Sequence, residues 1–339
     1  MAKDDKKKPW KKILLIIFLV IIIITGIIVG ILYSKLFNLN IQEIDKSNLG
    51  INDDLYSKVS DHISESDFKN IKNFVLFGID TQSSGDGQDA EDFIGRTDTI
   101  MIVSINPRYK TIKLISIPRD TYAEIEGHGK MKINYAHLFG GAQLAIKTIN
   151  ETFSLNLTEY ATVDFSGLVH IINDIGGIDL FITEEEESFI NRYSSVAYSI
   201  SGNKKKWINK YGNVTLDGEQ AVTHARNRTN GDGDFTRTER QRKVIEALFT
   251  KISKMDAGKI YSLIDMFLKE ITTNIDIPTY MGLLSDILLN KSTYLSSIIS
   301  AQIPNENHAT SEWIDGIYYF VPSDEQKMKE DMWNYIYLK

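Results

Sequence analysis

The chain has 339 residues, with 38 Lys and Arg against 45 Asp and Glu, which gives a formal net charge of −7. Hydrophobic residues make up 42% and charged residues 24%, and these fractions exclude a wholly disordered chain. Cysteine is absent, which excludes disulfides, thiolate zinc sites, iron–sulfur clusters and cysteine nucleophiles. The acidic balance gives no reason to expect a nucleic-acid partner.

The charge is unevenly placed, because residues 1–12 contain six Lys and two Asp and carry +4, which leaves −11 for the rest of the chain. An uncharged, almost wholly apolar run of 20 residues follows directly, at 13–32. A helix of this length spans the roughly 30 Å of a membrane's hydrocarbon core. Residues 13–33 are therefore predicted to form a transmembrane helix that anchors the protein in the cell membrane. The lysines before it predict that 1–12 is a cytoplasmic tail and that the main part is extracellular.

The remaining chain is divided into a stalk and a layered domain. Residues 34–70 are polar and mixed and are interpreted as an extracellular stalk, and 71–339 as the extracellular domain. Apolar runs rich in β-formers predict strands at 73–79, 99–105, 111–117, 159–163, 178–182 and 317–321. Periodicity near 3.6 predicts helices at 141–150, 165–174, 219–225, 237–254, 261–268 and 324–337. The turn residues 106–109 predict a hairpin, and the alternation of strands with helices predicts an α/β fold. The acidic run 184–187 is interpreted as a helix start or a solvated loop.

The first candidate cluster for chemistry follows the strand predicted at 73–79. Asp80 comes directly after this strand, and Arg96 and Asp98 come after an acidic, glycine-rich loop. Side chains at the carboxyl end of a strand point into the crevice where α/β sheets bind ligands. Carboxylates without Cys or His partners suit a hard cation such as Mg²⁺, with Mn²⁺ as a second candidate. The loop also offers three alternative carboxylate ligands, Asp86, Asp89 and Asp92.

The second cluster closes the strand predicted at 111–117, where a proline ends the ladder and Arg119 and Asp120 follow. A surface ion pair between these two residues is the alternative to an anion-binding role for Arg119. The downstream motif KINYAH contains Lys132, a further candidate for substrate binding, and His137, which we interpret as structural.

The third cluster, residues 224–243 (HARNRTNGDGDFTRTERQRK), has five arginines within 17 residues. Arg226 and Arg228 would face the same way in an extended segment, and Arg237 and Gln241 share one face of a helix at i, i+4. The planar guanidinium group is suited to bidentate phosphate binding. The alternative is a solvated basic face, but these arginines are interleaved with Gly and Asp rather than with Glu at salt-bridge spacing.

Carboxylates and arginines outside a membrane match the needs of a membrane-bound diphosphate substrate. A metal ion and the arginines would neutralise the phosphates, while a carboxylate would accept a proton from an attacking hydroxyl. No P-loop, Gly-x-Ser-x-Gly or His-Glu-x-x-His motif in the sequence competes with this interpretation.

Seven ordered motifs between about Asn73 and Ile252 resemble the LytR–CpsA–Psr family of Gram-positive envelope proteins: GID, GRTDT, IPRDT, KINYAHLFGG, DFSGLVHIINDIGGIDL, LDGEQAVTHARNR and GDFTRTERQR. The resemblance implies a three-layer α/β/α domain with a central mixed sheet. It also implies transfer of a glycopolymer phosphate, of wall teichoic acid or capsular polysaccharide, from undecaprenyl pyrophosphate to the muramic acid 6-hydroxyl of peptidoglycan.

The resemblance implies roles for individual residues as well. The family's metal-binding aspartates fall on Asp80 and Asp98. Its catalytic positions fall on Asp98, Arg119, Arg226 and Arg228. Its pyrophosphate-binding positions fall on Arg96, Arg119, Arg226, Arg228, Arg237 and Gln241, and Asp234 matches one further family position.

Two other functions remain open from the sequence. One is a scaffold or sensor that binds a lipid-linked glycan without turnover. The other is a pyrophosphate hydrolase in which water takes the place of the acceptor hydroxyl. The C-terminal 85 or so residues carry no motif that bears on this choice.

Overall fold

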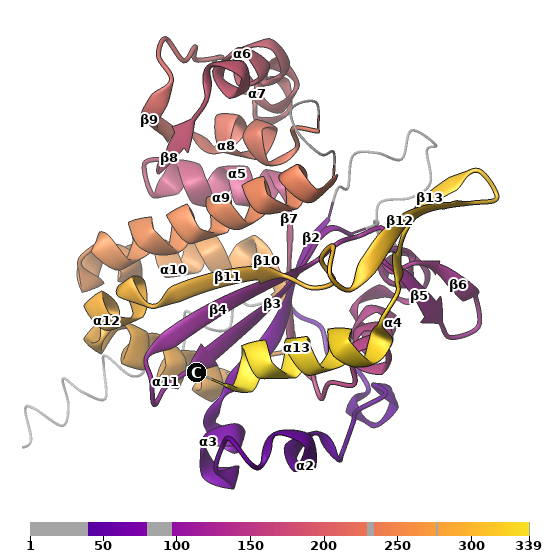
Figure 1. Ribbon diagram of the computed structural model, residues 1–339. Coiled ribbons are helices and arrows are strands. Elements are labelled where there is room, and N and C mark those ends of the chain that lie inside the picture. The colour runs from indigo at the N-terminus through magenta and orange to yellow at the C-terminus, as the bar shows by residue number, and fades with distance from the viewer. Residues whose placement is uncertain (1–39, 80–96, 229–233, 276, 339) are drawn as a thin grey trace, which may run out of the picture.

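The computed structural model describes residues 40–79, 97–228, 234–275 and 277–338 (Figure 1). In these residues a mixed sheet of seven strands forms the centre of the molecule, in the order β1–β10–β7–β2–β3–β4–β11. Its strands in this order are β1 (Asn40–Ile41), β10 (Ile271–Thr273), β7 (Tyr160–Asp164), β2 (Lys72–Ile79), β3 (Thr97–Asn106), β4 (Thr111–Ile117) and β11 (Ile298–Gln302).

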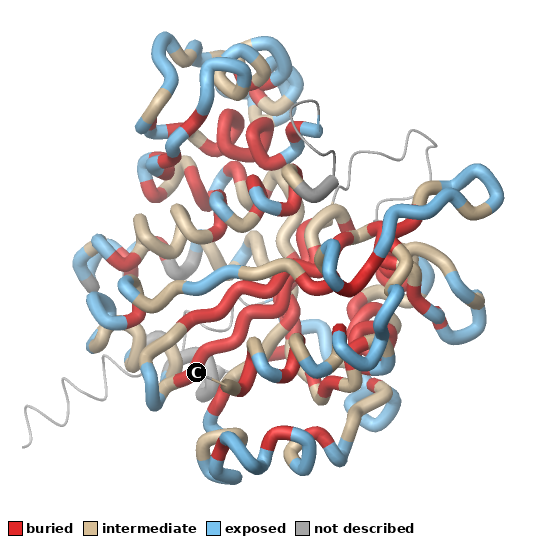
Figure 2. Tube along the Cα trace, in the orientation of Figure 1, coloured by how far each residue is buried: buried red, intermediate tan, exposed pale blue. Residues whose placement is uncertain are grey.

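The central strands β2, β3 and β4 pair antiparallel, and parallel partners flank them, β7 beside β2 and β11 beside β4. Strands β3 and β4 are buried along nearly their whole length, as the red tube in Figure 2 shows. Burial on both faces explains the continuous apolar run 100–103 in β3, whereas β4 carries Lys113 and Ser116 among its apolar residues. The predicted strands at 73–79, 99–105 and 111–117 and the hairpin that joins the last two are confirmed.

One face of the sheet packs against the main hydrophobic cluster, to which the C-terminal helix contributes Met328, Met332 and Trp333. The Trp333 indole Nε1 also donates a hydrogen bond to the Phe153 carbonyl oxygen at 2.9 Å, which ties the two largest helices of this layer together. The helices on this face are η1 (Lys46–Asn48), α2 (Leu55–Val59), α3 (Glu65–Asn70), α4 (Tyr135–Phe153) and α13 (Glu325–Tyr337). Helix α4 starts earlier than the sequence predicts and bends at Gly141, whose φ of +59° suits glycine.

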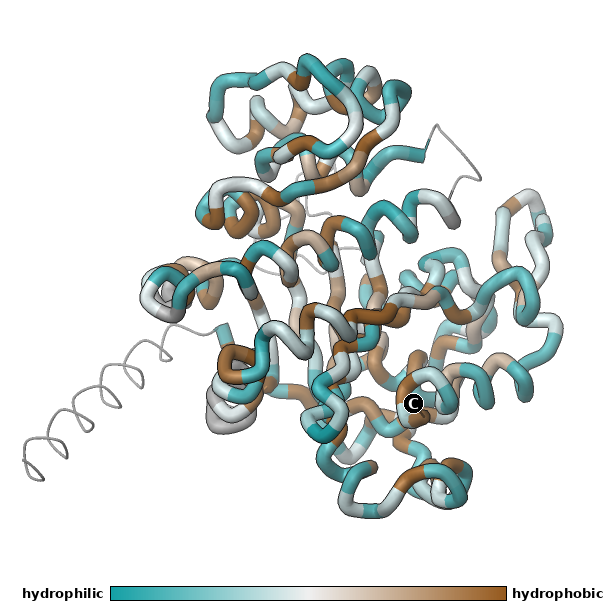
Figure 3. The backbone as a smooth tube through the Cα atoms, turned by 60° about the vertical axis from the view of Figure 1, so that its left-hand side comes forward, coloured by the Kyte–Doolittle hydropathy of each residue, from teal (hydrophilic) through white to brown (hydrophobic). Residues whose placement is uncertain are grey.

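The other face packs against a second apolar cluster, in which Met101 and Leu114 from the sheet meet Ile245 and Tyr294 from helices. Figure 3 shows the apolar residues concentrated along the strands and the inner helix faces. The covering helices are α9 (Asp234–Lys254), α11 (Ile277–Leu289) and α12 (Lys291–Ser296). Helices thus cover both faces of a mixed sheet, and the α/β fold expected from the sequence is confirmed.

A smaller lobe, at the top of Figure 1, has its own apolar cluster around Ile178, Leu216 and Ala221. Its two strands, β8 and β9, pair antiparallel with each other and not with the central sheet. The lobe consists of α5 (Phe165–Asp174), β8 (Ile178–Ile182), α6 (Glu184–Tyr193), α7 (Ser195–Ser201), β9 (Gly212–Leu216) and α8 (Gly218–Ala225). Helix α10 (Ala257–Lys269) contacts α5 and β10 and lies between this lobe and the central sheet. Two further hairpins consist of β5 (Tyr122–Ile125), β6 (Gly129–Lys132), β12 (Ala309–Ile314) and β13 (Ile317–Pro322).

Residues 40–70, which the sequence assigns to a stalk, belong to the folded domain. Leu49, Leu55 and Val59 are at most 2% exposed and join the main cluster, and β1 extends the central sheet by pairing with β10. Leu55, Val59 and Ile63 recur every four residues, a helical spacing, but the polar residues around them favoured the stalk interpretation.

The predicted cytoplasmic tail and transmembrane segment, 1–33, lie outside the described residues. Among the residues that the structure does describe, no helix is long and apolar enough to cross a bilayer.

Candidate functional site

The site lies at the start of β3, where Asp98 is the second residue of the strand. Because β3 and β4 pair antiparallel, with Ile100 opposite Ile117, the start of β3 lies beside the end of β4. The segment that follows β4 therefore brings Arg119 to Asp98, although 21 residues separate the two in the chain.

Three arginines converge on one oxygen of Asp98. Arg119 Nη1 donates a hydrogen bond to Asp98 Oδ1 at 2.6 Å. Arg228 Nη2 lies 3.9 Å from the same oxygen and Arg237 Nη1 lies 4.0 Å from it. The Arg237 side chain is 3% exposed, whereas that of Arg228 is 51% exposed and faces solvent. The cluster thus has a buried cation at its base and an accessible one at its rim.

Arg119 is held from a second direction by Asp120, whose carboxylate is 5% exposed and lies 3.5 Å from Arg119 Nε. Lys132 Nζ lies 2.7 Å from the other Asp120 oxygen, so Lys132 reaches the site only through Asp120. Arg119 therefore forms an ion pair with Asp120 and also contacts Asp98. Buried Asn134 connects the two strand ends. Its side-chain amide donates a hydrogen bond to the Thr97 carbonyl oxygen, and its backbone N–H donates one to the Arg119 carbonyl oxygen.

Helix α9 supplies Arg237 and Gln241 from one of its faces, as their spacing predicts. Gln241 Nε2 donates a hydrogen bond of 3.4 Å to the Asp98 carbonyl oxygen. The helix thus contacts Asp98 at both its side chain and its backbone, and this fixes α9 against the start of β3. His137 is buried and packs against the ring of Phe77, as expected for a structural residue.

Arg226 is the C-terminal cap of α8. Its guanidinium carbon is 4.9 Å from the centroid of the Phe165 ring, at the first residue of α5. A guanidinium group over an aromatic face is attracted by the ring, so Phe165 helps to position Arg226. Arg226 and Arg228 are both exposed, whereas Asn227 between them is fully buried.

Sequence reasoning missed the network that holds this pair of arginines. Arg240, 4% exposed, donates from Nη1 to the Asn227 carbonyl oxygen at 3.0 Å and from Nε to Glu186 Oε1 at 2.7 Å. The other oxygen of Glu186 accepts the backbone N–H of Thr183 in the capping box of α6. Both residues belong to patterns noted in the sequence, Glu186 to the acidic run 184–187 and Arg240 to the third cluster. Nothing in the sequence indicated that they contact each other.

Burial governs protonation in this network. Burial raises the pKa of Glu186, but the hydrogen bonds from Arg240 and the Thr183 backbone N–H, together with nearby positive charge, outweigh it, so the net pKa is lowered and Glu186 stays ionised. His224, whose Nδ1 lies 4.0 Å from Glu186, is 1% exposed. Burial lowers the pKa of His224 to about 4, which makes it neutral at physiological pH. The Glu186–Arg240 pair is therefore a fixed ion pair beside an uncharged imidazole.

Several predicted site residues fall outside the described residues, namely Asp80, Asp86, Asp89, Asp92 and Arg96. Asp234 begins α9, but its side chain lies outside the description too. In the described part of the chain, no three His, Asp or Glu side chains gather as metal ligands would. Asp98 is the one predicted metal ligand whose surroundings are described, and its hard oxygen donor suits Mg²⁺ chemically.

The described geometry favours binding of an anion. Arg119, Arg228 and Arg237 gather around Asp98, and with Lys132 and Asp120 included the described residues keep an excess of positive charge, with Arg228 exposed at the rim. Such an arrangement binds phosphate oxygens and stabilises charge that develops on them.

Comparison with known proteins agrees with this chemistry. The model of the LytR_cpsA_psr family matches residues 38–334. The chain belongs to this family. The family named from the sequence motifs is thus confirmed, and the match extends beyond them to include residues 40–70 and the C-terminal helix.

Named relatives of the chain act on teichoic acid. It is 32% identical over 266 residues to the polyisoprenyl-teichoic acid–peptidoglycan teichoic acid transferase TagU of Oceanobacillus iheyensis, covering 76% of this chain and 73% of the relative. Its fold is similar to TagT bound to LI-WTA, with a TM-score of 0.60, 26% identity and coverage of 79% and 92%. It is also similar to the family protein YwtF (TagT) with bound octaprenyl pyrophosphate lipid, with a TM-score of 0.58, 25% identity and coverage of 79% and 91%.

Proposed function

We propose that this protein transfers a glycopolymer from a polyprenyl-pyrophosphate carrier to a hydroxyl of peptidoglycan, the muramic acid 6-hydroxyl being the expected acceptor. The observation that carries the proposal is the convergence of Arg119, Arg228 and Arg237 on Asp98. The named relatives support teichoic acid as the polymer, and capsular polysaccharide is the alternative polymer.

The proposed reaction is a phosphoryl transfer. The acceptor oxygen attacks the phosphorus that bears the glycan, the bond from that phosphorus to the bridging oxygen breaks, and polyprenyl phosphate leaves. The acceptor's proton passes to a carboxylate, for which Asp98 is the candidate. The arginines orient the two phosphates and stabilise the charge that moves onto the bridging oxygen.

We propose Asp98 and Asp80 as ligands of a Mg²⁺ ion, with Mn²⁺ as a second candidate. Ile79 pairs with Thr97 across β2 and β3. Asp80 follows Ile79 in the sequence and Asp98 follows Thr97, so this pairing is compatible with both aspartates binding one ion. When bound, such a cation would neutralise phosphate oxygens. Arg96, bonded to Thr97, would add a further phosphate contact.

The proposal includes the membrane. Residues 13–33 would anchor the protein with its N-terminus in the cytoplasm, so that the site works at the outer surface of the cell membrane, where a lipid-linked substrate resides. An apolar groove between the sheet and its helices would receive the lipid tail.

The full-length protein in lipid nanodiscs tests the function. With labelled polyprenyl-pyrophosphate glycan, peptidoglycan oligomers and Mg²⁺, we expect label to appear on peptidoglycan. Arg228→Ala should lower the rate by about 10²–10³-fold, the usual cost of losing one preorganised donor. Arg108→Ala is the matched control, because Arg108 is 58% exposed and also pairs with one aspartate.

Other outcomes would identify the alternatives. Binding of the lipid-linked glycan without transfer would favour a scaffold. Release of glycan phosphate in the absence of acceptor would favour a hydrolase.

A further inference from the structure

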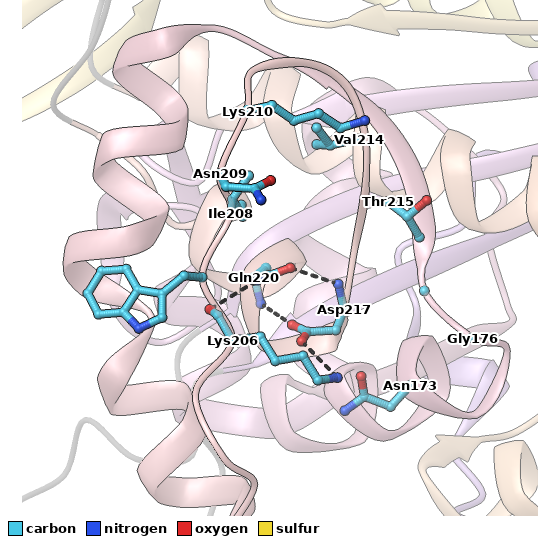
Figure 4. Close-up of a pocket in the computed structure, with 12 residues that line it drawn as sticks. Asn173, Gly176, Lys206, Ile208, Asn209, Lys210, Val214, Thr215, Asp217 and Gln220 are labelled. Carbon is cyan, nitrogen blue, oxygen red and sulfur yellow. Dashed lines mark hydrogen bonds and ion pairs between the residues drawn. The ribbon is translucent and has the colours of Figure 1, made fainter.

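A second polar pocket lies in the smaller lobe, at the opposite ends of the two helices that carry Arg226 and Phe165. It has a volume of about 420 Å³ and lies between the end of α5, the start of α8 and the loop that precedes β9 (Figure 4). Helix α8 runs from its N-cap Asp217 at this pocket to its C-cap Arg226 at the arginine site. At about 1.5 Å per residue, the pocket lies about 14 Å from that site along the helix.

The loop beside the pocket combines positive charge with an exposed indole. Residues 202–216 contain four lysines and no acidic residue, in a chain whose net charge is −7. Trp207 is 69% exposed and lines the pocket together with Lys206 and Lys210. Large exposed apolar side chains in soluble domains mark interaction sites when they lie in a defined surface.

Trp207 is held in place. Lys205 Nζ lies 4.2 Å from the centroid of its ring and is itself bonded to the Asn191 carbonyl oxygen at 2.5 Å. The residue after Trp207 is fixed twice, because Ile208 N–H donates to the Asn191 side chain and its carbonyl accepts from the same amide. The residue before it is fixed by Gln220 Nε2, which donates to the Lys206 carbonyl at 3.3 Å. A large apolar ring is thus presented to solvent on a rigid support, which lowers the cost of binding a partner.

The polar lining indicates the partner. Asn173, Asn209 and Thr215 line the pocket, and Asp217 adds a carboxylate that Lys206 approaches at 3.4 Å (Figure 4). The Asn173 amide also bonds to Gly218 N–H and to Glu219, and the Thr215 hydroxyl donates to Asp179, so the protein fixes the orientation of both groups. Such a lining suits the hydroxyl and amide groups of sugars and is too polar for a hydrocarbon chain. An aromatic ring packs against the C–H face of a pyranose, and lysines pair with phosphate or carboxylate.

We propose that this pocket binds a sugar unit of an anionic saccharide chain, with Trp207 stacked on the ring and Lys206 and Lys210 paired with the acidic groups. The inference rests on the proposed function for its source of saccharide. That source is either the phosphate-bearing polymer of the donor or the carboxylate-bearing glycan of the acceptor. In either case the pocket would hold the saccharide chain at a distance of about the length of α8 from the reacting phosphate.

The test measures binding of two labelled probes to the full-length protein in nanodiscs made of uncharged lipid. One probe is a lipid-free polymer of sugar and glycerol phosphates, and the other is a peptidoglycan oligomer freed of attached polymer. Trp207→Ala should weaken binding of one or both probes about tenfold or more, and Trp207→Phe should restore most of it, because stacking needs only an aromatic ring. Loss for the polymer alone assigns the pocket to the donor, and loss for the oligomer alone assigns it to the acceptor.

Matched controls separate this pocket from other effects. Trp313→Ala removes another indole, 74% exposed on the β12–β13 hairpin, and should leave both affinities unchanged. Binding of a polyprenyl pyrophosphate without sugars should be equal in the wild type and in Trp207→Ala, so failure of transfer and failure of this pocket give different results. Unchanged affinity of Trp207→Ala for both probes would overturn the proposal. So would an effect confined to binding of anionic lipid vesicles, which would make the loop a membrane contact.

Discussion

At Asp98, a single carboxylate oxygen partly neutralises three guanidinium groups that would otherwise repel one another. Arg119 makes the short contact of 2.6 Å, while Arg228 and Arg237 remain near 4 Å, at ion-pair range without a hydrogen bond. A more negative ligand with several oxygens would satisfy these donors better than one carboxylate does. The residue therefore both stabilises the cluster and leaves it able to bind phosphate.

Replacing Asp98 with asparagine should separate catalysis from binding. The transfer rate is expected to fall about 10²–10⁴-fold, the usual range for loss of a proton-accepting group. Binding of the lipid pyrophosphate, measured in EDTA, should stay equal or become tighter, because a negative charge beside the phosphates is removed. Weaker binding of Asp98→Asn in EDTA would contradict this account, and the exposed Glu312→Gln serves as the control.

Arg240 is expected to stabilise the fold through Glu186. Arg240→Met should cost about 3–5 kcal/mol of unfolding free energy, since Glu186 would be left as a buried charge without its partner. The double variant Glu186→Gln with Arg240→Met should be more stable than Arg240→Met alone. Urea unfolding measures both, and a cost no larger than that of Arg108→Met would count against the network.

At the scale of elements, two short helices of the small lobe pack unusually closely. A Cβ atom at Gly218, the first residue of α8, would lie 2.2 Å from the Val169 carbonyl oxygen of α5. The first turn of α8 can therefore approach α5 only with glycine at this position. Since α8 ends at Arg226, this contact sets where the arginine lies.

Gly218→Ala should therefore destabilise the protein by about 1–3 kcal/mol or more, because the backbone of α5 must move. Gly282→Ala in α11 is the matched control, since no atom lies within 4 Å of its Cβ position, and it should be neutral or stabilising by up to about 1 kcal/mol. Thermal unfolding of the two variants decides the matter, and equal midpoints would refute the close-contact argument.

Helix α8 also carries the buried His224, which predicts a pH dependence. Its pKa falls from 6.5 to about 4 through burial, so the folded state favours the neutral ring. This contribution to stability is complete above about pH 6.5 and is lost progressively as the pH falls toward 4, by up to about 3 kcal/mol. His224→Gln should flatten the stability profile in that window, as measured by urea unfolding at each pH. A profile as steep as that of the wild type would contradict the assignment.

Sequence patterns predicted the long apolar strands and the helices of the core well, because β3 and β4 are buried on both faces, β2 is partly buried, and α5 and α13 are amphipathic. It missed β10, which has only three residues, and β11, in which only the first two residues are large and apolar. Residue chemistry singled out Asp98 and Arg119 beside strands and Arg237 on a helix, in three separate clusters, and these three residues lie together in the structure. Arg240 and Glu186 were not predictable, because their contact joins residues 54 apart through the packing of two helices.

At the scale of the whole molecule, segments distant in sequence complete one core. The segment 40–70 supplies Leu49 and Leu55 to the same cluster that receives Met332 and Trp333 from α13. The family match across 38–334 covers both segments. The motif-bearing part of the chain, 73–252, is therefore not an independent folding unit.

Removing residues 1–70 should prevent folding, whereas removing 1–39 should not. Each of the buried aliphatic residues Leu49, Leu55, Val59 and Ile63 contributes about 1.5–3 kcal/mol. Their sum is comparable to the whole stability of a domain, about 5–15 kcal/mol. Near-ultraviolet circular dichroism and cooperative thermal unfolding of the two truncated chains would show the difference. A cooperative transition in the chain that starts at 71 would restore the stalk interpretation.

The partial neutralisation at Asp98 also bears on selectivity among lipids. Arg119, Arg228, Arg237 and Lys132 carry four positive charges against the carboxylates of Asp98 and Asp120, which leaves two positive charges among the described residues of the site. A head group with two or more negative charges would bring that centre to neutrality, whereas a phosphodiester lipid, with one, would leave it cationic. In a membrane where abundant phospholipids outnumber the scarce carrier, this difference in valence would keep the ordinary lipids from occupying the site.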